Sequence, residues 1–130
     1  MSSKSLWGAM PDVESIRTPQ EIIQEQGDFL AQATAGLLEI DMERKQKGTL
    51  FSYTCFIHVP VLKHRLSILR VTHDIKLFPC ILHHEQTGEE YTAQNQEEFE
   101  SDLGSILSSE ETKIIITGLM AQARLEREDC

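Results

Sequence analysis

The sequence predicts an α+β protein: a long N-terminal helix, an antiparallel meander sheet of three or four strands, and two C-terminal helices. Segments with strand-like apolar patterns occupy the middle of the chain, between positions 50 and 93. Segments with helical apolar spacing occupy both ends. Strands that cluster together, rather than alternate with helices, are typical of the α+β class. The connections between strands are short, which favours antiparallel neighbours.

Length and composition fit one globular domain. The chain has 130 residues, of which 40% are hydrophobic and 25% charged, close to the usage of ordinary globular proteins. We expect residues 1–17 to form an irregular arm, residues 18–126 a single domain, and residues 127–130 a frayed tail. Trp7 and Met10 are the arm residues that could pack onto the domain.

The first predicted helix begins at Thr18 and runs to about Lys47. Thr18, Pro19 and Glu21 have the spacing of a capping box with proline at the first helical position. Apolar residues follow at helical steps. Basic residues and Gly48 at the far end suit a helix C-terminus.

Four strand-like segments follow, at residues 50–59, 65–73, 77–84 and 91–93. The first alternates apolar and polar residues and stops at Pro60. The second has apolar residues on both sides. Pro79 places the third at an edge or a bulge. Asn95 and Ser108 then have the spacing of N-caps for two C-terminal helices.

The charge balance argues against nucleic acid as a partner. The formal net charge is -9, from 21 acidic and 12 basic residues, whereas binding to phosphates requires clustered lysine and arginine. No segment has the length and apolarity of a membrane span, and the first ten residues lack the apolar centre of a signal peptide. Three cysteines without paired spacing favour a reducing compartment. We therefore expect a cytoplasmic protein that does not bind membranes.

All five histidines lie in the strand region, which raises the question of a metal site. A tight meander would set His58 beside Leu66 and His83 beside Ser67, so that His58, His64 and His83 would share one end of the sheet. Their spacing matches no ligand template, and adjacent strand residues point to opposite faces. These three histidines are therefore only weak metal candidates, and we predict neither a metal nor another cofactor.

No catalytic residues are predicted. A cysteine, a histidine and an acid can be combined on paper, as Cys80, His73 and Asp74, but a chain of this size always permits such a combination. The sequence contains no nucleophile elbow, zinc-protease motif or phosphate-binding loop.

The sequence also predicts a second apolar face of the sheet, which is more informative about function than the histidines and cysteines. If helices cover one face, the other would present Phe56, Leu66, Ile68 and Ile81, which we predict as an interaction face. A contiguous apolar surface usually marks a binding site for a partner, and a symmetric dimer is the commonest solution. Helices divided between both faces would cover it equally well.

These observations lead to a functional expectation. We expect a small acidic protein without catalytic activity, which acts by binding itself or another protein as an adaptor, inhibitor or immunity-type antagonist. The alternative is a small metal- or cysteine-dependent enzyme that uses the histidine- and cysteine-rich strands.

Overall fold

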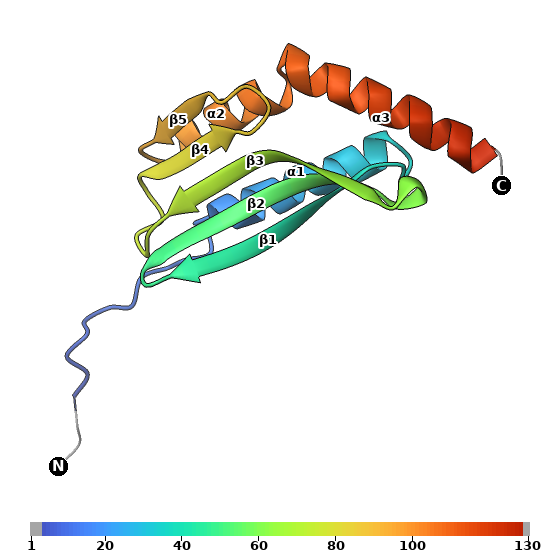
Figure 1. Cartoon of the computed structure of the whole chain (residues 1–130). Coiled ribbons are helices and arrows are strands. Elements are labelled where there is room, and N and C mark those ends of the chain that lie inside the picture. The colour runs from blue at the N-terminus through green and yellow to red at the C-terminus, as the bar shows by residue number, and fades with distance from the viewer. Residues whose placement is uncertain (1–3, 129–130) are drawn as a thin grey trace.

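Five antiparallel strands in the order β1-β2-β3-β4-β5 form the sheet of the structure, a computed structural model that describes residues 4–128. The chain order, one helix followed by the strands and two C-terminal helices, confirms the predicted class and topology (Figure 1). The sheet has five strands rather than three or four. The elements are α1 (Pro19–Ala33), β1 (Glu39–Lys47), β2 (Leu50–Val59), a 3₁₀ turn η1 (Pro60–Leu62), β3 (His64–His73), β4 (Cys80–His84), β5 (Glu90–Ala93), α2 (Gln96–Leu107) and α3 (Glu110–Glu128).

The extra strand comes from the segment predicted to be the second half of the first helix. The predicted start is confirmed, since Thr18 and Glu21 form a capping box. The helix nevertheless ends at Ala33 instead of Lys47. Ala35 and Gly36 have positive φ angles of 51° and 82°, a backbone geometry that ends a helix. Residues 39–47 then form β1, in which Ile40 and Met42 alternate with acidic neighbours.

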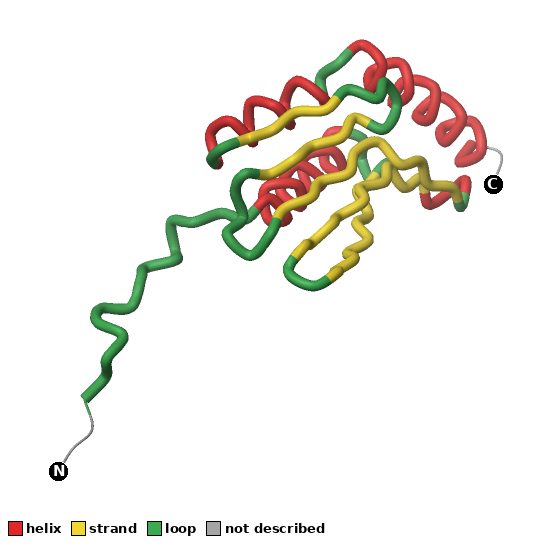
Figure 2. The backbone as a smooth tube through the Cα atoms, turned by 60° about the vertical axis from the view of Figure 1, so that its left-hand side comes forward, coloured by secondary structure: helices red, strands yellow, loops and turns green. Residues whose placement is uncertain are grey.

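All three helices pack on the same face of the sheet (Figure 2). Helix α1 contacts β1, α2 contacts β4 and β5, and α3 reaches η1. The core between helices and sheet is apolar. Its largest fully buried side chains include Leu38, Ile57, Leu69, Leu82 and Phe99.

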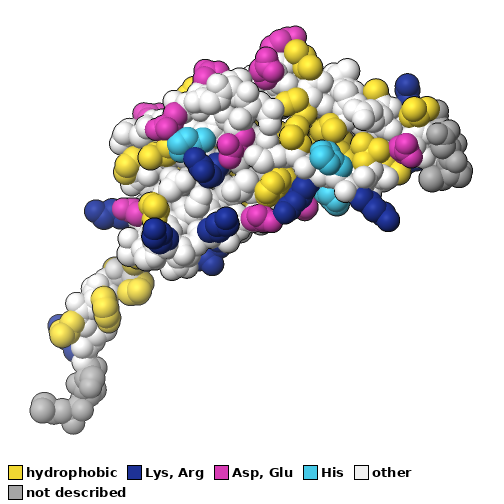
Figure 3. All heavy atoms as spheres, viewed as in Figure 1, with side chains coloured by type: hydrophobic (Ala, Val, Ile, Leu, Met, Phe, Trp, Pro, Cys, Tyr) yellow, Lys and Arg dark blue, Asp and Glu magenta, His cyan; other side chains and the backbone are white. Residues whose placement is uncertain are grey.

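The other face of the sheet, which we call the open face, is not the apolar surface that the sequence predicted. A β-bulge between Cys55 and Phe56 shifts the register with β3, and Ile68, Leu69 and Val71 are all buried. The open face presents mainly serine, threonine, histidine and charged side chains, and Figure 3 shows the histidine and charged side chains on it. Helices on one side and polar residues on the other are the usual arrangement of an antiparallel sheet.

Both ends of the described chain extend from this core. Residues 4–17 form neither helix nor strand, and they run away from the domain at the start of α1 (Figure 1). At the other end, Arg127 and Glu128, expected to fray, continue α3. The remainder of the predicted tail, residues 129–130, lies outside the described residues.

Candidate interaction site

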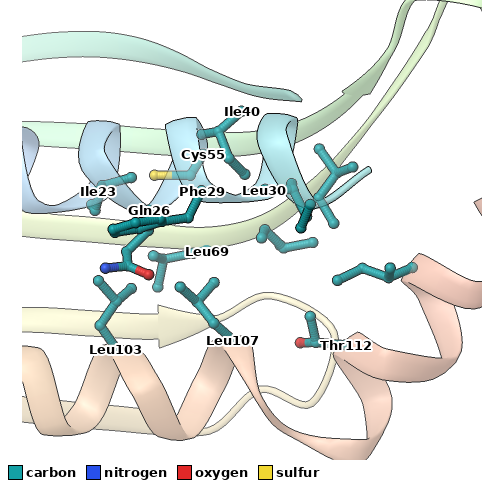
Figure 4. A pocket seen from close by; sticks show the side chains of 14 residues that line it. Ile23, Gln26, Phe29, Leu30, Ile40, Cys55, Leu69, Leu103, Leu107 and Thr112 are labelled. Carbon is teal, nitrogen blue, oxygen red and sulfur yellow. The ribbon is translucent and has the colours of Figure 1, made fainter. Parts of the chain in front are cut away.

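The helical face contains an apolar groove of about 260 Å³ between α1 on one side and α2 with α3 on the other (Figure 4). Strands β1, β2 and β3 form its floor. We call it the helical groove. Its lining residues are Ile23, Gln26, Phe29, Leu30, Ala33, Ile40, Cys55, Ile57, Ile68, Leu69, Leu103, Leu107, Thr112 and Ile116.

The groove exists because the helices cover the sheet incompletely. On this face, helix α1 packs on β1 and helix α2 packs on β4 and β5 at the opposite edge, so the middle strands lack a helix directly above them. Leu30 and Leu107 face each other across this gap from α1 and α2 (Figure 4). An apolar groove with open walls is the kind of surface that binds an apolar segment of a partner.

Phe29 marks the rim of the groove. Its side chain is 56% exposed, although it lies beside buried Ile23 and half-buried Leu30 on the groove side of α1. Aromatic side chains such as phenylalanine are enriched in the interfaces between proteins. Phe29 is one of the apolar residues at helical steps after Thr18, a spacing that does not predict its exposure.

Two polar side chains give the groove a limited hydrogen-bonding capacity. The Thr112 hydroxyl already donates to the backbone oxygen of Ile106 at 2.8 Å. The Gln26 amide forms no hydrogen bond with any described residue, and it points between α1 and α2 (Figure 4). Gln26 can therefore bond to the backbone of a bound segment without breaking an existing contact.

The four residues predicted as an interaction face do not form one surface. Phe56 and Ile81 lie on the open face, where the Arg65 guanidinium stacks 4.0 Å from the Phe56 ring centroid. Ile68 is buried and forms part of the groove floor. Leu66 pairs with Ile57, whose side chain points toward the helices.

The three candidate histidines are not gathered at one end of the sheet. His58 pairs with Arg65 instead of Leu66, and His83 pairs with Arg70 instead of Ser67. The two partner positions are five residues apart on β3, or about 17 Å at 3.4 Å per residue. One metal ion therefore cannot bind both His58 and His83.

His58 instead meets two carboxylates of β1 that the sequence analysis had placed on a helix. Its Nδ1 atom lies 2.8 Å from a Glu39 oxygen and 3.8 Å from an Asp41 oxygen. One ligand atom from each residue lies within 4.8 Å of the others. His83 makes a similar contact, with its Nδ1 atom 3.4 Å from a Glu90 oxygen. Such cross-strand pairs stabilise sheets. His83 meets one carboxylate, whereas His58 meets two.

The cysteines are poorly suited to nucleophilic catalysis. Cys55 and Cys80 are 1% and 0% exposed, and loss of solvation raises the pKa of each thiol to about 12. Only the thiolate is nucleophilic. Cys80 and His73 pair across β3 and β4, but the His73 ring bonds the backbone oxygen of Asp74 at 2.7 Å rather than its carboxylate. Cys130 lies outside the described residues.

Comparison with known proteins gives no functional lead: no family model, curated protein or solved structure matches the chain. Among the described residues, no helix combines the length and apolarity needed to cross a membrane. The function of this chain is therefore inferred from its own residues.

Proposed function

We propose that this chain is a non-catalytic binding protein whose helical groove holds an apolar segment of another protein, and which also associates with itself. The groove is the observation that supports this proposal. It has an apolar floor and walls, an exposed aromatic rim residue in Phe29, and an unbonded amide in Gln26. Recognition of an amphipathic helix uses a hydrophobic groove, and recognition of a polyproline-type segment uses a groove lined by aromatic residues.

The net negative charge of the chain favours a partner with basic residues. With a net charge of -9, the protein attracts basic proteins over distances of about a Debye length, roughly 8 Å at physiological salt. We therefore propose a partner whose apolar segment is flanked by basic residues, as expected for an adaptor, an inhibitor or an antagonist of a basic protein. Neither nucleic acid nor a membrane is a proposed partner.

A cytoplasmic location forms part of this proposal. The cysteines Cys55 and Cys80 are free and buried as thiols, which suits a reducing compartment.

A matched pair of variants tests the groove. Phe29→Asp adds a charge at the rim, and Ile75→Asp makes the same kind of change at a 67% exposed residue between β3 and β4. Full-length protein is used to capture partners from native extract, with mass spectrometry as the readout and circular dichroism to verify folding. We expect a partner that binds wild type and Ile75→Asp equally and is lost with Phe29→Asp. Equal capture by all three proteins would refute the groove as the binding site.

A metal-dependent enzyme is the second candidate, supported by the cluster of Glu39, Asp41 and His58. Imidazole and carboxylates bind several divalent transition metals, and a hollow beside the cluster is lined by His64 and Arg65. Metal analysis of untagged protein separates the candidates. One equivalent of metal, lost in His58→Gln but retained in His83→Gln, would favour the enzyme.

A further inference from the structure

The arm, residues 4–17, has five large apolar side chains without cover. Leu6, Trp7, Met10, Val13 and Ile16 are between 47% and 94% exposed, and hydrophobic side chains are visible along the arm (Figure 3). The last four recur every third residue. In the structure, the backbone N–H of Ile16 donates to the oxygen of Val13 in a turn. When the arm is extended as a polyproline-type chain, which has three residues per turn, these four side chains share one side.

The helical face of the same chain has a continuous channel with apolar residues in its lining, into which the apolar side of an arm fits. A shallow groove between α1 and α2, lined by Ile22 and Gly104 among others, shares Gln26, Leu103 and Leu107 with the helical groove. The two hollows together follow α1 from Ile22 to Ala33, about 17 Å at 1.5 Å per residue. When extended as a polyproline-type chain, the segment from Trp7 to Ile16 spans about 28 Å at 3.1 Å per residue. The arm is therefore long enough to fill the channel.

The junction between arm and domain directs the arm away from its own channel. Thr18 caps α1 and adopts extended geometry before Pro19, as a residue before proline prefers. The Arg17 guanidinium bonds Glu25 at 2.5 Å and Glu100 at 3.3 Å. The arm then runs away from the helices, opposite to the direction of α1 (Figure 1). To reach its own channel it would have to reverse at this fixed junction.

We propose that the arm of one copy lies in the helical groove of a second copy, and that the reciprocal exchange forms a symmetric dimer. This inference rests on the proposed function, since it uses the same groove and names a second copy of this chain as an occupant. Each copy then supplies one arm and one groove, which is the self-complementary requirement of a twofold dimer. Partner binding and self-association compete for one surface.

Trp7 provides a direct readout because it is the only tryptophan in the chain. Light scattering and fluorescence emission are measured together over a dilution series of full-length protein. We expect a mass of twice 14.8 kDa with blue-shifted emission at high concentration, and a monomer with red-shifted emission on dilution. A blue-shifted monomer at every dilution would show that the arm occupies its own groove, which overturns the exchange. An exposed Trp7 at every concentration also overturns it.

Two complementary variants test the contact itself. Trp7→Asp has a defective arm and an intact groove, and Phe29→Asp has the reverse. Replacement of a large aromatic contact residue by a charge weakens an interface by about 30-fold or more, so we expect each variant alone to be monomeric at concentrations where wild type is dimeric. Mixing them should restore a complex and shift the emission of Trp7 in Phe29→Asp to the blue. Ile75→Asp serves as control and should dimerise like wild type.

The same variants separate this inference from the proposed function. If Trp7→Asp dimerises normally while Phe29→Asp loses partner capture, the arm exchange is wrong and the groove remains the binding site. If Phe29→Asp changes neither dimerisation nor capture, both proposals fail.

Discussion

The buried thiols of Cys55 and Cys80 link single residues to the pH dependence of stability. Burial raises the pKa of each to about 12, from an ordinary value of 9.0. A group whose pKa is raised by folding stabilises the protein below the unfolded pKa, and this contribution is lost as pH rises through the folded pKa. We therefore expect stability to fall between pH 9 and 12, by up to about 1.4 kcal/mol per thiol at pH 10.

Chemical denaturation at pH 8 and pH 10 measures this loss. The variant Cys55→Ala with Cys80→Ala is the control, since it should lose correspondingly less stability over the same interval. Both thiols should also react with an alkylating reagent only on unfolding. Rapid modification of the native protein at pH 8 would contradict the burial and the raised pKa.

The residue types alone pointed to the histidines as candidate metal ligands, but they did not show which side chains lie beside them. His58, His64 and His83 were the candidates, but their partners depend on strand register. The bulge at Cys55 and Phe56 shifts the partner of His58 by one residue, and the pairing of β3 with β4 sets the partner of His83. A bulge inserts one residue without an obvious signal in apolar alternation. The cluster at His58 was missed for a second reason, because Glu39 and Asp41 were assigned to a helix.

At the scale of elements, Gly27 shows how closely α1 approaches the sheet. A Cβ atom at this position would lie 2.9 Å from the Cβ atom of Ile40, and neither backbone can move independently of its element. Gly27→Ala improves helix propensity by about 1 kcal/mol, but the overpacking costs about 1–3 kcal/mol. We expect a net loss of stability in thermal or chemical denaturation.

Gly118 in α3 is the matched control. A Cβ atom there meets no other atom within 4 Å, so Gly118→Ala should stabilise the protein by about 0.5–1 kcal/mol through helix propensity alone. Stabilisation by both substitutions would show that α1 can move away from β1 without cost.

The elements predicted best were those with local signals. The capping box of Thr18 and the cap of Asn95 are present as expected, with the Asn95 side chain accepting from Glu98 at 2.9 Å. The predicted end of the first helix was wrong, because the apolar residues from 34 to 47 fit helical spacing by coincidence. The positive φ angle of Ala35, which ends the helix early, has no strong sequence signal. Sheet pairing of β1 with β2 overrides local preference there.

At the scale of the whole molecule, the sequence correctly predicted the class and the meander but not which surface is left apolar. The prediction assumed that apolar residues on both sides of β3 would appear on both sides of the sheet. The bulge turns Ile68 and Leu69 inward together. The uncovered apolar surface is consequently between the helices, where strand periodicity gives no information.

Salt provides the last prediction, because the proposed dimer joins two chains that each have a net charge of -9. At about 10 mM salt the Debye length is near 30 Å and the copies repel each other across the interface, whereas at about 150 mM it is near 8 Å. Contacts between apolar arm and groove are not screened. We expect dimerisation to strengthen on the order of tenfold over this range, measured by analytical ultracentrifugation. Trp7→Asp should remain a folded monomer at both salt concentrations. If the wild-type dimer instead dissociates on addition of salt, the interface is held by ion pairs and not by the apolar side of the arm.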